Sequence, residues 1–255
     1  MTTDRLGNAG SAYSFDGNDR VKIEDNSDLV VQDETLTIAS WVKIPSEGVR
    51  PYNVLLGGWT GYGYMIYVGG NNLDGVIQFD LKGAGGNNIC GLQSTTDLRD
   101  NQWHYIAVTF DGSSAKAFVD GTLENENSFS TSYQSSSGNP LKIGYINHSS
   151  ATNEYFPGLA DEVQIWNEAL SASEVTALYN SGTALDARTN AGDYSSTANL
   201  KGYWKMEDGS GTTLTDVSGY GNDGTIDGAS WTTGVSSTSY DNTPKVIEKS
   251  SVTVK

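Results

Sequence analysis

The chain has 255 residues and a formal net charge of −16, with 31 Asp and Glu against 15 Lys and Arg. Such an acidic surface repels phosphate backbones and anionic lipids and disfavours nucleic acid as a partner, although dense carboxylates attract divalent cations. The single cysteine, Cys90, excludes an internal disulfide framework, and no run of about 18 apolar residues predicts a membrane span.

The first two thirds of the chain read as short strands separated by polar turns. Residues 103–121 read WHYIAVTFDGSSAKAFVDG, two apolar-rich runs around a short polar turn, which is typical of a β-hairpin. Both faces of its first run carry apolar side chains, and this favours a position inside a sandwich. The same alternation, bounded by Gly, Asn, Asp or Ser, recurs at residues 11–23, 36–44, 62–68, 75–81 and 141–145. We therefore predict an all-β chain, an antiparallel sandwich or jelly roll.

One short helix is predicted after these strands. Ser171 and Glu174 have the spacing of a capping box, and they begin a helical pattern over residues 172–179. Its apolar side chains would pack on the sandwich.

The remaining chain divides by composition. Residues 1–182 are predicted to form the core of the sandwich, and the polar stretch 183–199 a linker or long loop. Residues 200–232 again contain apolar runs and turns. Residues 233–255, rich in Ser, Thr, Asn and Lys, are predicted to be a flexible tail.

Four segments identify a family. SAYSFDGNDRVKIED, LTIASWVK, WHYIAVTFDGSSAKAFVDG and GLADEVQIWNEALSASEVTALY, in this order, closely resemble bacterial laminin G-like jelly-roll modules of the concanavalin A-like lectin/glucanase superfamily. The last segment is also similar to the end of a pentraxin domain. The resemblance implies an antiparallel β-sandwich with one short helix.

The C-terminal segment resembles the same family in an inverted order. LKGYWKMEDGSGTTLTDVSGYGNDGTIDGASW looks like the opening of such a module, which normally comes just before the SFDG strand. Residues 200–232 are expected to complete the same sandwich, because a two-stranded fragment cannot bury its apolar face alone. The alternatives are that the segment begins a second module, or that it is exchanged between neighbouring chains.

The resemblance implies a structural calcium site. In related sandwiches a calcium ion commonly joins the beginning of the domain to its final strand through one carboxylate from each, and Asp16, Gly17, Asn18 and Asp161 resemble that arrangement. The alternative is that Asp16 forms a turn and Asp161 caps a strand. A second acidic stretch, DVSGYGND at residues 216–223, also offers oxygen ligands, but its glycines favour simple turns.

A group of aromatic residues predicts a sugar-binding surface. Flat rings beside glycines can stack on the apolar faces of sugars, and neighbouring amides can hydrogen-bond the hydroxyls. The alternative for any one ring is core packing. Candidate ligand contacts in GGWTGYGYMIYVGG and the residues that follow are Trp59, Tyr62, Tyr64, Tyr67, Asn71 and Asn72, with His148 in a second group near the sandwich rim.

No motif predicts catalysis. Retaining glycoside hydrolysis needs two carboxyl groups about 5 Å apart, and the alternating carboxylate motif of the superfamily's glucanases is missing. Glu124 and Glu126 alternate but lie beside a turn and are expected to face solvent. His104 belongs to a strand motif and is expected to be a core residue.

The sequence thus predicts a non-catalytic, calcium-stabilised carbohydrate-binding or adhesion module of a larger exported bacterial protein. Its partner would be a glycan or an extracellular protein, without membrane insertion. The expected location is extracellular or at the cell surface, with any export signal outside these residues. The alternatives are a structural spacer or protein-binding repeat without glycan affinity and, more remotely, a glycoside hydrolase.

Overall fold

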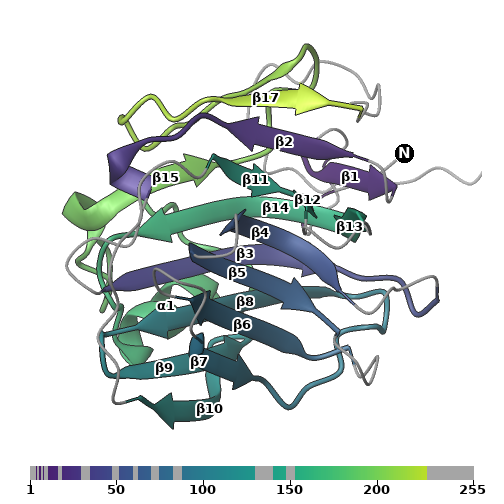
Figure 1. Cartoon of the computed structure of the whole chain (residues 1–255). Helices are drawn as coiled ribbons and strands as arrows, with labels where there is room; N and C mark the ends of the chain where they lie inside the picture. The colour runs from purple at the N-terminus through teal and green to yellow at the C-terminus, as the bar shows by residue number, and fades with distance from the viewer. Residues whose placement is uncertain are drawn as a thin grey trace, which may run out of the picture.

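A computed structural model describes residues 4, 6, 8, 11–16, 19–29, 35–47, 52–59, 63–69, 75–82, 88–129, 140–147 and 153–228. These residues form two stacked antiparallel sheets (Figure 1). The predicted antiparallel β-sandwich with one short helix is confirmed. Among the described helices, none has the length and apolar character needed to cross a membrane.

The seven-stranded sheet has the order β1-β14-β3-β8-β9-β10, and β15 also pairs with β14. Its strand β14 is the longest and lies near one edge. The bounds are β1 (Tyr13–Asp16), β3 (Leu36–Lys43), β8 (Trp103–Phe110), β9 (Ser114–Val119), β10 (Thr122–Ser128), β14 (Pro157–Trp166) and β15 (Leu200–Trp204).

The eight-stranded sheet has the order β16-β17-β2-β11-β4-β5-β6-β7. A separate hairpin, β12 (Tyr145–Asn147) with β13 (Asn153–Tyr155), follows β11 directly. The strands of the sheet are β2 (Arg20–Ile23), β4 (Asn53–Trp59), β5 (Gly63–Val68), β6 (Ile77–Lys82), β7 (Asn88–Gln93), β11 (Leu141–Ile143), β16 (Thr213–Leu214) and β17 (Gly224–Asp227). The described residues also include three short 3₁₀ helices: η1 (Ser27–Leu29), η2 (Asn180–Gly182) and η3 (Thr197–Asn199).

The main core lies between the two sheets and follows from the period-two alternation of their strands. In β8, Ile106, Val108 and Phe110 point into this core, while Tyr105 and Ala107 belong to a second cluster on the outer face. Both faces of the strand are therefore buried, as its sequence predicts. Burial of this kind supplies most of the favourable free energy of folding.

The helix α1 (Ala172–Tyr179) and the loop 183–199 cover the outer face of the seven-stranded sheet. The predicted capping box is present: the Ser171 hydroxyl accepts from the Glu174 backbone N–H, and the Glu174 side chain accepts from the Ser171 N–H. In the loop, Tyr194 is buried, and its hydroxyl accepts from Trp166 Nε1 at 3.0 Å. The stretch 183–199 is thus a packed cover of the sheet.

The C-terminal segment pairs with both sheets within this chain. Strand β15 lies along Val163–Trp166 of β14, and β1 lies along Pro157–Ala160 on the same strand. Strand β17 extends the other sheet by pairing with β2. Trp204 and Leu214 of the segment are completely buried between the sheets.

The carboxylate of Asp216 organises the turn that connects these C-terminal strands. It accepts from the backbone N–H groups of Tyr203, Ser218 and Asn222, each at 2.9 Å, and from the Ser218 hydroxyl at 2.8 Å. Its side chain therefore ties the turn to β15. These hydrogen bonds agree with the interpretation of residues 216–223 as turns.

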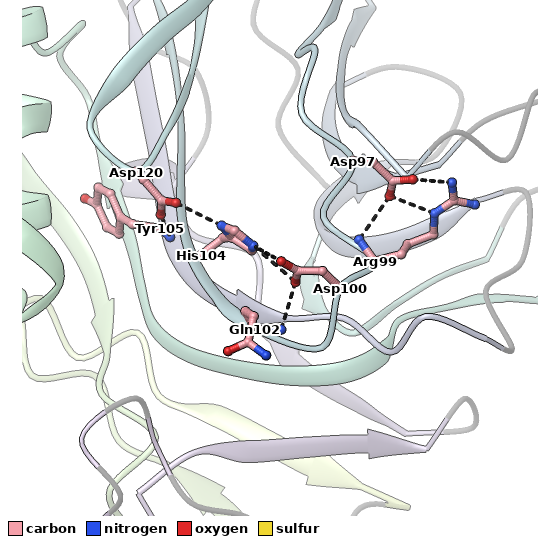
Figure 2. A network of polar contacts seen from close by, with 7 residues as sticks. All are labelled: Asp97, Arg99, Asp100, Gln102, His104, Tyr105 and Asp120. Atoms are coloured by element: carbon pink, nitrogen blue, oxygen red, sulfur yellow. Dashed lines mark hydrogen bonds and ion pairs between the residues drawn. The ribbon is translucent and has the colours of Figure 1, made fainter.

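His104 joins two loops at one end of the sandwich (Figure 2). Its Nδ1 lies 2.9 Å from Asp120 Oδ2, and its Nε2 lies 3.2 Å from Asp100 Oδ1. The hydrogen bond to Asp120 is the main cause that raises the pKa of His104 above its ordinary value. His104 is therefore a polar clamp between the β7–β8 loop and the β9–β10 turn, whereas the sequence predicts a core residue.

We expect Asp216→Ala to lower the free energy of unfolding by about 3 kcal/mol, because it leaves several buried donors without their charged acceptor. Chemical denaturation measures the loss. Asp223→Ala is the control, since the exposed Asp223 accepts from a single described backbone donor, the Asp216 N–H at 2.8 Å, and about 1 kcal/mol is expected there. Equal losses in the two variants would contradict the organising role of Asp216.

We expect His104 to make the protein less stable as the pH rises. A raised folded pKa gives stabilisation that is complete below the unfolded value of about 6.5 and is lost as the pH passes the folded value. Thermal unfolding between pH 6 and 9 should show this decline in the wild type. The difference between wild type and His104→Gln should shrink over the same range, and a pH-independent difference would contradict the clamp.

Candidate functional site

The structure places the predicted aromatic contacts on different faces of β5. Tyr64 points into the core between the sheets, is 3% exposed, and donates a hydrogen bond to the Leu29 carbonyl at 2.7 Å. This position fits the core-packing alternative. Tyr67 lies in a separate cluster on the outer face of the eight-stranded sheet.

Other predicted contacts cannot be placed in the same way. Trp59 lies in β4, where only its backbone is described. The remaining candidates, Tyr62, Asn71, Asn72 and His148, lie outside the described residues.

The two acids of the predicted calcium site lie on neighbouring strands of one sheet. Asp16 is opposite Pro157, and Asp161 is four residues further along β14, opposite Trp41. At ~3.3 Å per residue this separates the two positions by about 13 Å along the strand. Within the part of the chain that the structure describes, no group of three or more His, Cys, Asp or Glu is arranged to hold a metal. Gly17 and Asn18 lie outside that part, and calcium binding stays a prediction.

Three polar side chains form a connected group on the outer face of β5 and β6. Tyr67 is opposite Gln78 in the strand register, and Asp80 follows two residues later on the same face. The Tyr67 hydroxyl lies 3.0 Å from Gln78 Oε1 and 3.2 Å from Asp80 Oδ2. The amide of Gln78 in turn donates to the Gly69 carbonyl. These contacts fix the Gln78 and Asp80 side chains in place.

The Asp80 carboxyl is partly exposed and lies beside open space. Burial raises its pKa above the ordinary value, against the opposing effects of the Tyr67 hydroxyl and of Lys82. Gly91 is its neighbour on β7, and a Cβ at that position would approach no atom closer than Asp80 Oδ1 at 3.8 Å. Asp80 therefore offers a positioned, partly desolvated acceptor beside a glycine of the neighbouring strand.

The β12–β13 hairpin crosses this outer face. It begins at Gly144, whose φ of +80° turns the chain away from β11, and the space beside this glycine is filled by the Phe15 ring. Ile146 then packs on Val54, Met65 and Tyr67. The hairpin thus buries the apolar middle of the face and leaves a polar area on each side.

The carboxylates considered for catalysis have structural roles. Glu124 Oε2 accepts from the backbone N–H groups of Thr95 at 2.7 Å and Thr96 at 3.0 Å. The expectation that Glu124 faces solvent is therefore wrong, because it anchors the β7–β8 loop. Glu126 is exposed and accepts from the Ser114 hydroxyl at 2.9 Å. His104 has a carboxylate on each ring nitrogen, which leaves neither nitrogen free to act as a base.

The sequence analysis missed Gln78 and Asp80. The signal was present in GVIQFDL, where Ile77, Phe79 and Leu81 point into the core and the residues between them point out. Gln78 and Asp80 share the polar side of this strand, and a polar side next to Tyr67 is a sufficient reason to predict them as ligand contacts.

Comparisons with known proteins place the chain in a family. A family model described as the concanavalin A-like lectin/glucanases superfamily matches residues 15–176. No curated protein matches. A solved structure from Bacteroides ovatus, a candidate carbohydrate-binding protein, is 18% identical with a TM-score of 0.64, over 86% of this chain and 58% of that one.

A second solved structure is the binding domain of Paraclostridial Mosquitocidal Protein 1. It is 16% identical with a TM-score of 0.53, over 64% of this chain and 41% of that chain. A heptameric pentraxin from Limulus polyphemus is 16% identical with a TM-score of 0.49, over 66% of this chain and 81% of that one. The present chain spans less than two thirds of the first two proteins, and these similarities concern the fold. Because the family model matches more than half of the chain, the protein belongs to the laminin G-like family of the concanavalin A-like lectin/glucanases superfamily.

Proposed function

We propose that this domain binds carbohydrate, without catalysis, on the outer face of the eight-stranded sheet. The observation that carries the proposal is the Tyr67–Gln78–Asp80 group, in which the Tyr67 hydroxyl, itself beside Gln78 Oε1, contacts a partly buried carboxylate. A carboxylate of this kind accepts hydrogen bonds from sugar hydroxyls strongly, because it is charged and already partly desolvated. The family, and the similarity in fold to a candidate carbohydrate-binding protein, support the same function.

The form of the surface also favours a polysaccharide. Asp80 and Gly91 lie opposite each other on adjacent strands, where the glycine carries no side chain, and Tyr52 adds a partly buried ring 5.4 Å from the Tyr67 ring. Polar side chains beside an aromatic ring suit the extended face of a sugar chain. The same proposal places the domain outside the cell or at its surface, where polysaccharides are found, as part of a larger exported protein.

Affinity gel electrophoresis with neutral polysaccharides tests this function. We expect at least one of a panel of β-glucan, xyloglucan, xylan and mannan to retard the wild-type protein. Asp80→Asn should weaken that binding about tenfold, because a charged acceptor contributes roughly 1.5–3 kcal/mol. This variant keeps a carbonyl acceptor for the Tyr67 hydroxyl and should fold normally.

Asp193→Asn is the matched control, because it makes the same charge change at an exposed position in the loop 183–199. Its mobility without polysaccharide should equal that of Asp80→Asn, and its retardation should equal that of the wild type. Retardation of Asp80→Asn equal to that of the control would contradict the site. Absence of retardation on every polysaccharide would instead favour a spacer or protein-binding repeat.

Calcium binding at Asp16, near the start of the domain, is a separate part of the proposal. Asp161 lies four residues further along β14, about 13 Å away, and would not share the same ion. A cation present at 100 times its Kd stabilises the folded state by about 2.7 kcal/mol, so Tm should be several degrees higher in CaCl₂ than in EGTA. Asp16→Asn should remove the difference, whereas Asp193→Asn should retain it. Equal Tm values of the wild type in the two buffers would rule out a stabilising calcium ion.

A further inference from the structure

Three cations gather on the outer face of β2 and β11, on the other side of the hairpin from Asp80. Lys22 is directly opposite Lys142 in the antiparallel register of these strands. Arg20 lies two residues before Lys22 and therefore on the same face. Like charges directly opposite each other on a sheet are destabilising, and this arrangement occurs in a chain of net charge −16. Such a local accumulation of cations needs a physical explanation.

The Tyr145 ring holds two of these cations close together. Arg20 Cζ lies 5.4 Å and Lys142 Nζ 5.5 Å from the centroid of this ring. Tyr145 is almost completely buried, and its ring packs on Tyr155 of the same hairpin, with centroids 4.9 Å apart. The ring therefore acts as a fixed support for the two cations.

The charges are only partly compensated within the protein. Arg20 pairs with Asp227 and Lys22 with Glu24, and both carboxylates are exposed, so these ion pairs are weak. In the described part of the chain, no carboxylate pairs with Lys142. Burial, together with the charges of Arg20 and Lys22, lowers the pKa of Lys142. An anion at this position would remove the repulsion that the fold leaves uncompensated.

We propose that Lys142, Lys22 and Arg20 bind one acidic group of a sugar, a carboxylate or a sulfate, beside the β12–β13 hairpin. The inference rests on the proposed carbohydrate-binding function and specifies the class of glycan. Two of the three cations are already paired, and the net charge of −16 repels a polyanion. The ligand is therefore a glycan in which acidic sugars are separated by neutral ones. The neutral sugars would extend past the β12–β13 hairpin towards Asp80.

Titration calorimetry with glucuronate, glucose 6-sulfate and glucose tests the site directly, in a low-salt buffer free of phosphate and sulfate. We expect at least one acidic sugar to bind at least tenfold more tightly than glucose. Binding of glucuronate alone identifies a carboxylate site, and binding of glucose 6-sulfate alone identifies a sulfate site. Affinity for both acidic sugars no greater than for glucose would overturn the proposal.

Lys142→Met should weaken binding of the acidic sugar about tenfold and should raise Tm without ligand, because it removes the repulsion between Lys142 and Lys22. Lys201→Met is the matched control: Lys201 Nζ also lies on a tyrosine ring, 4.2 Å from the centroid of Tyr220, but on the other sheet. Its affinity for the acidic sugar should equal that of the wild type. Equal weakening in the two variants would overturn the assignment to Lys142.

The two proposals can fail separately. Loss of neutral-polysaccharide retardation in Asp80→Asn, without selectivity for acidic sugars, would retain the carbohydrate-binding function and reject the anion site. Selective binding of an acidic sugar, sensitive to Lys142→Met, supports the anion site even where no neutral polysaccharide retards the protein.

Discussion

Strand β14 is paired along both of its edges, and the sandwich depends on this pairing. On one side it meets β3, and on the other it meets β1 and β15, which come from opposite ends of the described chain. Where the pairing of β14 changes from β1 to β15, its register with β3 on the other edge shifts between Asp161 and Gln164. Glu162, whose φ is +52°, lies in this interval. This bulge marks the place where the edge changes from β1 to β15. Residues 200–228 are therefore integral to the sheet in this chain.

Closure of the sandwich determines which surface is available for a ligand. Helix α1 and the loop 183–199 bury the outer face of the seven-stranded sheet under a second apolar cluster. At the end of the sandwich, Asn125 and Asn127 of β10 donate to backbone carbonyls of β7 and join the two sheets. Among the described residues, the β12–β13 hairpin is the element that crosses the outer face of the eight-stranded sheet. The two sides of this face differ in charge, with a carboxylate on β6 and three cations on β2 and β11.

Much of the fold was predictable, because apolar alternation and capping signals act locally. The short strands, the hairpin at residues 103–121 and the capping box at Ser171 follow from sequence spacing alone. The role of Tyr64 was not predictable in this way. All of β5 is buried, since the hairpin covers its outer side, and its sequence therefore does not show which rings face the core. The close approach of Lys22 and Lys142 was equally hidden, because it depends on a strand pair 120 residues apart in the sequence.

The central claim, that the outer face of the eight-stranded sheet binds the ligand, is tested most directly by NMR. Backbone amide shifts of the isotope-labelled protein would be followed during titration with an oligosaccharide that carries one glucuronate on a neutral chain. The account predicts that shifts concentrate on β6 and β7 around Asp80 and on β2 and β11 around Lys142. Shifts confined to α1 and the loop 183–199, on the opposite side of the sandwich, would contradict it.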